Sequence, residues 1–460
     1  MRYVPAGYRN TDGSFNNRTN NTNIWSSVES GGNAWKRNLN YTEARVNRNT
    51  NNKANGFSVR CLKDWLNFYM PPDKLLIDLF QAYYDARKNK RSTINALAFE
   101  IDYESKLFEL YKEIKNGAYK INRSVCFISF KPVQREIFAA DFRDRIVHHL
   151  IYNYISPFFE RLFISDSYSC RLGRGTSYGI KRLDHFIRSS SQNYAKDCYI
   201  LKLDIQGYFM AIDHFLLYEK IEVVLNWFRK EANFDIDLIL SLIRQSIFYD
   251  PTKNCIMKGK KENWNGLPRS KSLFWTDKNK GLPIGNLTSQ LFGNIYLNGF
   301  DHFVKHKLRC RYYGRYVDDI VIVHQDKECL KSLVSLLREY LQKELSLELH
   351  PKKIYLQHFS KGVCFLGAVL KPRRIYIGDQ TKGSFYKKIK CWNDFIEEKP
   401  SEFNGENLKQ FLSCINSYLG NMEQFNTYKL RKKMLTQNFS PQFWNYFCVS
   451  KNYDKLLAKI

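Results

Sequence analysis

The sequence predicts an α+β fold with a helical C-terminal region. Apolar residues recur at helical spacing in several long segments, most clearly in 332–349. Short runs rich in β-branched and aromatic residues lie between these segments, as expected for strands. With 44% hydrophobic residues in a chain of 460, the protein has enough apolar surface for large cores.

The formal net charge of +27 indicates a polyanionic partner, and nucleic acid is the first expectation. No apolar run approaches the roughly 18 residues that span a bilayer, so no membrane partner is expected. The 11 Cys are scattered singly without a C-x-x-C pair. This spacing predicts neither a zinc ribbon nor a disulfide framework, and it favours reduced thiols and a cytoplasmic location.

The first 60 residues differ from the rest because 14 of them are Asn, with many Ser, Thr and Gly. This composition favours turns and loops over helices. Only the alternating run at 57–61 resembles a strand. Such a segment is too short for a large core of its own.

From residue 70 onward the pattern becomes regular. Asp73 can cap a helix over 74–91, and a second helix over 103–119 closes at Asn116-Gly117. Strands are predicted next, and the last 80 residues are mostly helical and basic. The predicted strands are 124–130, 198–205, 312–317 and 320–326.

Two adjacent acids, Asp318 and Asp319, stand between apolar and aromatic runs. The simplest geometry is a β-hairpin with the acids at its tight connection. An ordinary solvated turn would also contain Asp. The apolar flanks favour a hairpin in a core, where two carboxylates repel each other and need a cation.

A third acid, Asp204, ends the strand-like run 199–204 and precedes Gly207 and two aromatic residues. Three carboxylates from two strand ends suit Mg²⁺, which keeps water ligands and also binds phosphates. Two such ions about 3.5–4 Å apart can activate a hydroxyl and stabilise a leaving pyrophosphate. The segment 281–292 adds a Pro/Gly turn that opens a helix near 286–289, where small residues let a flat base pair approach.

These segments together resemble the motifs of reverse transcriptases. Asp204 in LKLDIQGYF, the stretch GLPIGNLTSQ (281–290) and YVDD (316–319) resemble motifs A, B and C in order. Residues 135–149 resemble the fingers motifs, 349–357 motif D and 362–367 motif E. The resemblance covers about residues 72–460 and implies a right-hand polymerase with fingers, palm and helical thumb.

Within that family, Ile284-Gly285 and Ser289-Gln290 are similar to the enzymes of diversity-generating retroelements. Group II intron enzymes usually have Gln-Gly and Ser-Pro at these places. The resemblance implies an error-prone copying of a template-repeat RNA into cDNA from dNTPs, with a small basic oligomeric accessory protein as partner. A group II intron-like or defence-associated reverse transcriptase stays open, as does a non-catalytic RNA-binding protein.

The resemblance also implies residue roles. Asp204 and Asp318 would ligate two Mg²⁺, or Mn²⁺ as a substitute, with Asp319 as a weaker member and the Ile205 carbonyl as a further ligand. Phe209 would exclude the ribose 2′-hydroxyl, and Lys352 or Lys353 would assist proton transfer to pyrophosphate. The remaining implied contacts with nucleotide, template or primer are Arg135, Ile284, Gln290, Arg143, Arg145, Arg171 and Arg174.

Four regions are therefore expected: a leader at 1–69, helices and fingers at 70–195, a palm at 196–370 and a thumb at 371–460. The leader resembles the end of a C-type-lectin-fold variable protein, the usual target of these retroelements. Adenine-rich codons of a template repeat translate as Asn, so the leader is interpreted as the translated template repeat. It would be non-catalytic, with Met70 as the start of the enzyme, and an Asn-rich solvated leader is the alternative.

Overall fold

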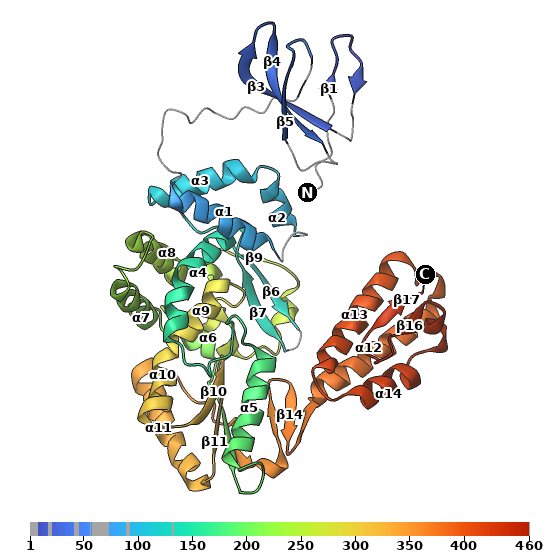
Figure 1. Ribbon diagram of the computed structural model, residues 1–460. Coiled ribbons are helices and arrows are strands. Elements are labelled where there is room, and N and C mark those ends of the chain that lie inside the picture. Colours follow the sequence, from blue (N-terminus) through green and yellow to red (C-terminus); the bar gives the residue numbers. More distant parts are fainter. Residues whose placement is uncertain are drawn as a thin grey trace. The chain divides into compact units, whose positions relative to one another are not determined.

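A computed structural model of the protein describes residues 8–16, 21–40, 46–55, 57, 73–88, 93–130 and 133–459. The chain divides into two compact units, residues 1–72 and 73–460 (Figure 1). None of the helices in these described ranges is both long enough and apolar enough to cross a membrane.

The described part of the first unit is made of strands. As the composition predicts, none of these described residues is helical. Most of them form strands, however, and not the expected loops. Cross-strand contacts give the physical reason: Asn38 Nδ2 donates to Asn23 Oδ1 at 2.7 Å, and the rings of Trp25 and Phe57 lie 4.4 Å apart. Beyond Phe57, the strand-like run at 58–61 lies outside the described residues. The strands are β1 (Tyr8–Arg9), β2 (Phe15–Asn16), β3 (Asn21–Ser30), β4 (Asn33–Asn40) and β5 (Val46–Asn52), with β3, β4 and β5 in one antiparallel sheet.

The second unit begins with the predicted helices. The Asp73 side chain accepts a hydrogen bond from Leu75 N at 3.0 Å and so caps the first helix, as predicted. Asn116 and Gly117, the latter at φ +68°, close the third helix, also as predicted. The two predicted helices are α1 (Lys74–Arg87) and α3 (Tyr103–Lys115); α2 (Ile94–Glu100), which was not predicted, lies between them in the chain, and residues 89–91 of the first prediction lie outside the described residues.

A small sheet and a long helix follow. The antiparallel strands β6 (Val125–Ser129) and β7 (Arg135–Ala139) are joined by β9 (Ile256–Met257), which runs parallel to β6. Helix α4 (Phe142–Leu162) packs on α1 and on α9 (Leu287–Tyr296). Helix α4 therefore contacts α1, which precedes the central sheet in the chain, and also α9, which lies between two strands of that sheet in the chain.

The central sheet has the strand order β10-β11-β8-β12, all antiparallel. Alternating side chains give it two buried faces. Leu201, Leu203 and Ile320 pack with α9–α11, whereas Ile200 and Val321 pack with α5 and the β13–β14 hairpin. The elements are β10 (Tyr312–Tyr316), β11 (Asp319–His324), β8 (Tyr199–Asp204), β12 (Tyr355–His358), α10 (Asn298–His302), α11 (Lys327–Leu345), α5 (Thr176–Ser190), β13 (Val363–Phe365) and β14 (Ala368–Lys371).

The helix predicted over 332–349 ends earlier, at Leu345. Ser346 adopts φ +51°, a left-handed conformation that stops the helix. Leu347 and Leu349 are nevertheless buried, and they produced the extended apolar pattern.

The C-terminal region is mostly helical, as predicted, and has its own apolar core around Phe385, Phe411 and Met434. It also contains a β-hairpin at 447–458 that the sequence pattern did not predict. Its elements are β15 (Arg374–Ile377), α12 (Asp379–Glu398), α13 (Gly405–Glu423), α14 (Tyr428–Asn438), β16 (Phe447–Val449) and β17 (Leu456–Ala458). Three further helices lie between β8 and α9: α6 (Tyr208–Ala211), α7 (His214–Trp227) and α8 (Ile236–Phe248).

Candidate active site

The pairing of β8 with β11 places two acids directly opposite each other. Asp319 is the register partner of Asp204, and both point to the sheet face that also carries Val321. Directly opposed residues in an antiparallel pair have Cβ atoms about 4.5–5.5 Å apart. The carboxylates of two distant sequence segments are thus neighbours at one end of the sheet.

The third acid, Asp318, lies in the connection between β10 and β11. Tyr316 pairs with Asp319, so only Val317 and Asp318 form the turn. The predicted hairpin with the acids at its connection is confirmed. Val317 has φ +55°, a left-handed conformation that is costly for a β-branched residue. The turn therefore stores strain beside the acids.

The electrostatics of the three acids show a concentration of negative charge. Burial, and then the charges of Asp204 and Asp319, raise the pKa of Asp318 to about 6. Two lysines oppose this charge: Lys353 Nζ lies 2.8 Å from Asp204 Oδ2, and Lys202 Nζ lies 3.2 Å from Asp319 Oδ1. Such a site attracts further cations.

The donor set fits a divalent cation that prefers oxygen ligands, such as Mg²⁺. Asp204, Asp318 and Asp319 supply the carboxylates, and Ile205 follows Asp204 at the strand end, where it forms a bridge with Leu349. Among the described residues, no three His, Cys, Asp or Glu side chains are arranged so that they could hold a metal ion as they stand. Because Lys353 holds Asp204, a bound cation would replace this ammonium group.

A buried arginine, which sequence reasoning missed, supports the turn. Arg315 is fully buried, and its Nη1 donates to the carbonyl of Val317 at 2.9 Å. Its Nε and Nη2 bind both carboxylate oxygens of Asp301 at 2.7 and 2.6 Å. Asn294 Oδ1, 3.4 Å away, joins α9 to this network. The only sequence signal was a charged residue within a strongly apolar strand.

The predicted Pro/Gly turn and helix start at 281–292 are confirmed by α9, which begins at Leu287. Gly285 has φ +128°, and an added Cβ would lie 3.0 Å from the Phe138 carbonyl. Phe138 N donates to Ile284 O at 2.9 Å, so this turn is joined to β7. The Ile284 side chain packs against the cluster around Phe138, and Gln290 is exposed.

Phe209 lies in α6, five residues after Asp204. Its ring centre is 5.3 Å from that of Tyr208, and it faces Gly293 of α9, where an added Cβ would lie 3.3 Å from the ring. Its carbonyl accepts from Leu282 N at 2.8 Å. Motifs A and B therefore meet at this ring.

The predicted cationic contacts fall into two groups. Arg135 is exposed at the start of β7, Lys352 is exposed, and Arg174 stacks on the Tyr178 ring at 4.4 Å. Of the two candidate lysines, it is Lys353 that contacts Asp204. The other three arginines are bound inside the protein: Arg143 to Glu113 and Lys120 O, Arg145 to Ala140 O, and Arg171 to Glu160 and Ile164 O.

His148 joins α4 to α9. Its Nδ1 lies 2.9 Å from Thr288 Oγ1, and burial lowers the pKa of His148 to about 4. Because unfolded His has a pKa near 6.5, the folded state is stabilised by this residue above that pH and loses the contribution as pH falls towards 4.

We expect the unfolding free energy of the wild type relative to His148→Asn to drop by about 3 kcal/mol between pH 7.5 and 4. Urea denaturation across this range measures the difference, and a constant gap would contradict the prediction.

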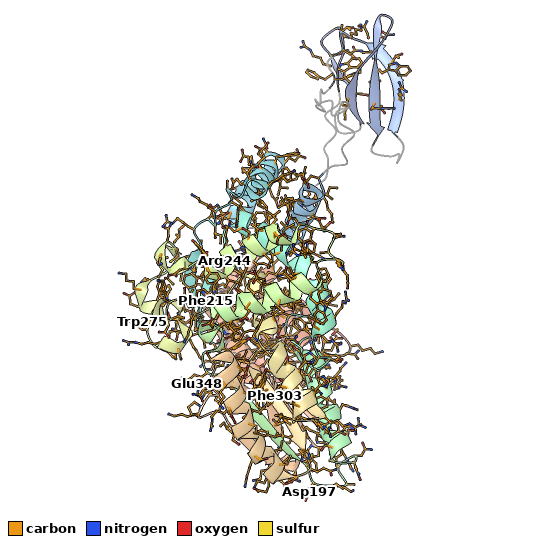
Figure 2. The ribbon with its side chains drawn as sticks, turned by 90° about the vertical axis from the view of Figure 1, so that its left-hand side faces the viewer. Asp197, Phe215, Arg244, Trp275, Phe303 and Glu348 are labelled. Atoms are coloured by element: carbon orange, nitrogen blue, oxygen red, sulfur yellow. The ribbon has the colours of Figure 1, made fainter. Side chains whose placement is uncertain are left out.

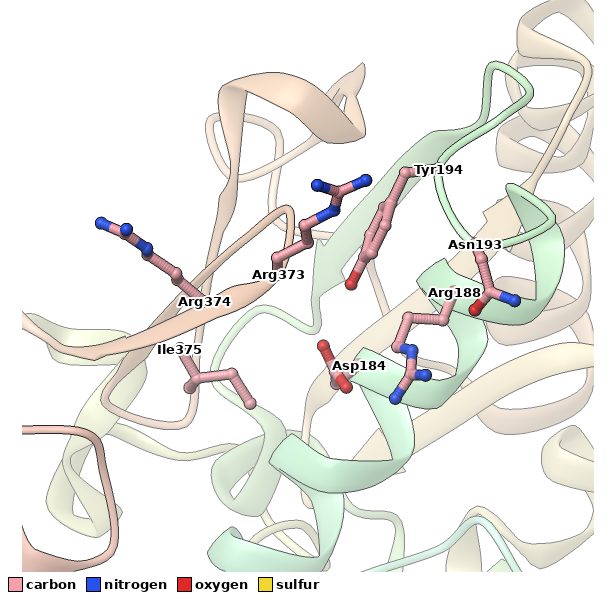
Figure 3. Close-up of a pocket in the computed structure, with 7 residues that line it drawn as sticks. All are labelled: Asp184, Arg188, Asn193, Tyr194, Arg373, Arg374 and Ile375. Carbon is pink, nitrogen blue, oxygen red and sulfur yellow. The ribbon is translucent and has the colours of Figure 1, made fainter.

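A cavity of the second unit lies away from the three acids. It has a volume of about 510 Å³ and is lined by residues of α5, the following loop and the β14–β15 turn, including Arg188, Tyr194 and Arg373 (Figure 3). Tyr194, which lines the cavity, precedes β8 at the strand end opposite Asp204. The five-residue rise along β8 to Asp204 spans about 17 Å. None of the predicted site residues lines this cavity.

The fold and the site together define a class. A four-stranded antiparallel sheet with opposed carboxylates at one end, flanked by a small sheet and a helical C-terminal region, is a right-hand polymerase. The family model described as reverse transcriptase (RNA-dependent DNA polymerase) matches residues 133–370, slightly more than half of the chain. The chain belongs to this family.

Solved telomerase structures are similar at low identity. The apo telomerase of Candida tropicalis is 13% identical, with a TM-score of 0.42 over 74% of this chain and 65% of that chain. The telomerase of Candida albicans in complex with a TWJ fragment of telomeric RNA is 12% identical, with a TM-score of 0.40 over 75% and 63%. A C-terminally truncated apo form from Candida tropicalis is 14% identical, with a TM-score of 0.40 over 56% and 55%. The chain spans less than two thirds of each of these proteins, and no curated protein sequence matches it.

Proposed function

We propose that the protein is an RNA-directed DNA polymerase that extends a primer with dNTPs on an RNA template. The observation that carries this proposal is the pairing of Asp204 with Asp319, with Asp318 in the adjoining turn, inside the family-matched region. Phosphoryl transfer depends on positioning and on charge stabilisation, and this site concentrates carboxylates for that purpose.

The acids Asp204, Asp318 and Asp319 would hold two Mg²⁺, or Mn²⁺, with the Ile205 carbonyl as a further ligand. When bound, the ions neutralise charge that develops on the phosphates and lower the pKa of the attacking hydroxyl. Lys353, which contacts Asp204, would be the residue that donates a proton to the leaving pyrophosphate. Exposed Arg135 offers a planar fork to triphosphate oxygens.

The test is extension of a DNA primer on an RNA template by the purified chain. Incorporation of dNTPs in Mg²⁺ or Mn²⁺ is expected. RNA binding without extension in either ion would favour the alternative of a non-catalytic RNA-binding protein. Loss of both extension and RNA binding would overturn the proposal altogether.

Phe209 is expected to act as the barrier against ribonucleotides. Phe209→Ala should raise the ratio of rNTP to dNTP incorporation by about 10- to 200-fold, because the removed ring leaves space for a 2′-hydroxyl. Single-nucleotide extension with each substrate measures this ratio. Phe215→Ala, at a 58% exposed Phe of α7, is the matched control and should leave the ratio unchanged.

The finer proposal is that the enzyme belongs to a diversity-generating retroelement. It rests on the similarity of Ile284-Gly285 and Ser289-Gln290 to that group and on the Asn-rich first 60 residues. The template would be a repeat RNA, the partner a small basic oligomeric protein, and residues 1–69 a non-catalytic translated copy of the repeat. Deletion of residues 1–69 should therefore preserve extension, and loss of extension would contradict this reading.

Low fidelity at template adenines is part of this finer proposal. An apolar Ile284 lacks a directional hydrogen bond to the nucleotide, worth about 0.5–1.5 kcal/mol. Ile284→Gln should therefore lower misincorporation opposite adenine by about 2- to 10-fold. Sequencing of cDNA products measures the spectrum, with Ile284→Val as the apolar control. An unchanged spectrum in Ile284→Gln would refute the role of Ile284.

A further inference from the structure

An exposed aromatic–arginine pair lies on a surface segment before α9. This linking segment, residues 261–276, contains three short 3-10 turns, η2 (Lys261–Trp264), η3 (Arg269–Lys271) and η4 (Leu273–Trp275). Trp275 is 62% exposed, and the guanidinium carbon of Arg269 lies 4.3 Å from its ring centre. Trp275 lies at the edge of the second unit (Figure 2), and both Trp275 and Arg269 are exposed to solvent.

Buried hydrogen bonds join the linking segment to β7. Glu136 of β7 is almost fully buried and accepts three hydrogen bonds from it: Trp264 Nε1 at 2.8 Å, Ser272 Oγ at 2.8 Å and Leu273 N at 2.7 Å. Leu273 is itself buried in the cluster with Phe138. The segment is therefore rigid where it meets the fingers, and the exposed pair is presented in a defined position.

The segment also touches the active site. A Cβ on Gly207 would lie only 2.6 Å from the Ser270 carbonyl oxygen, so the two backbones are in contact. Gly207, at φ +54°, follows Asp204 by three residues, which limits their Cα separation to about 11 Å. Ser270 is the direct neighbour of Arg269. The residue next to Arg269 therefore contacts the turn that follows Asp204, and the same segment is bound to β7.

We propose that Trp275 and Arg269 form a stacking platform for an unpaired base of the RNA template next to the active site. This proposal rests on the proposed polymerase function. Bases of any sequence stack on aromatic rings and on arginine planes, and each such contact contributes about 1–3 kcal/mol. During copying, the unpaired strand next to the reacting base pair is the template that has not yet been copied. The charge of +27 favours this anionic occupant.

The experiment compares two primer–template duplexes, one with a 5′ overhang of several unpaired RNA nucleotides and one blunt. Trp275→Ala should bind the overhanging duplex about 5- to 100-fold more weakly and the blunt duplex as the wild type does. In the wild type, 2-aminopurine in the overhang should be quenched at one position by stacking, and Trp275→Ala should lose this quenching. Arg269→Ala should weaken binding in the same direction, and Trp275→Phe should restore most of it.

Trp227→Ala is the matched control, because Trp227 is 74% exposed, stacks on Phe228 and lies on α7. It should bind both duplexes as the wild type does. Equal binding of both duplexes by wild type and Trp275→Ala, in a preparation that extends primers, would overturn the platform but keep the polymerase. If Trp275→Ala changed only the self-association of the protein, the pair would be assigned to a protein contact. This result would likewise overturn the platform. A wild type that neither extends nor binds the duplexes would refute the polymerase function itself.

Discussion

Asp318→Asn is expected to lower primer extension on an RNA template by at least about a thousandfold. The amide keeps the shape of the carboxylate but removes the charge that would hold a divalent cation at the turn, a loss of several kcal/mol of transition-state stabilisation. Steady-state extension in Mg²⁺ measures the effect. Affinity for an RNA–DNA duplex should stay within about twofold, because Asp318 is not a cationic contact to phosphate. Residual activity near that of the wild type would contradict the assignment of Asp318.

The same substitution should make the metal-free protein more stable. The folded state raises the pKa of Asp318 to about 6, so it holds the proton more tightly than the unfolded chain. The stability of the wild type therefore falls as pH rises from about 4 to about 6, and Asn escapes this loss. At pH 8 with a chelator, Asp318→Asn should unfold with a free energy higher by up to about 3 kcal/mol. Added Mg²⁺ should stabilise the wild type and leave the variant unchanged, and the opposite pattern would refute the charge argument.

The second large effect is expected at the buried pair of Arg315 and Asp301. Arg315→Met should lower the unfolding free energy by about 3–5 kcal/mol, because it leaves the Asp301 carboxylate buried without its partner. It should also lower the rate of extension, since the Val317 carbonyl loses its donor in the strained turn. Denaturant titration and single-turnover extension measure the two effects.

A double variant separates the charge from the geometry. Arg315→Met with Asp301→Leu removes both charges, so its stability should recover relative to Arg315→Met alone. Its rate of extension should remain low, because the carbonyl of Val317 still lacks a donor. If the double variant loses as much unfolding free energy as the two single variants together, the two charges are not coupled, and the prediction is contradicted. Recovery of both stability and rate would show that the donor to Val317 is dispensable.

Much of the candidate site could be predicted from local sequence. Asp204 ends an apolar strand and Asp318-Asp319 separates two others, and both patterns are short apolar runs, typical of buried strands, with acids at their ends. The caps at Asp73 and Asn116 were likewise readable, because a helix end needs side chains or conformations that few residues supply. These features depend on neighbours within about ten residues along the chain.

Contacts between distant segments were not readable in this way. The Asn-rich strands β3, β4 and β5 oppose the local preference of Asn and exist through cross-strand amide contacts such as Asn38 with Asn23. Arg143 and Arg171 are predicted to contact nucleic acid, and in the structure they are bound to Glu113 and Glu160. A cationic side chain in a motif therefore says little until its partners are known.

By itself, the sequence determined where the acids stand, the three strands that carry or flank them, and the family to which the chain belongs. Only the tertiary structure decided that Asp204 faces Asp319, that Lys353 contacts Asp204, and that Arg315 supports the turn from within the core. The physical reason is that strand register and burial are set by packing between segments, which for Lys353 and Asp204 are 149 residues apart. Local periodicity specifies which face of an element is apolar, but it does not specify which element covers that face.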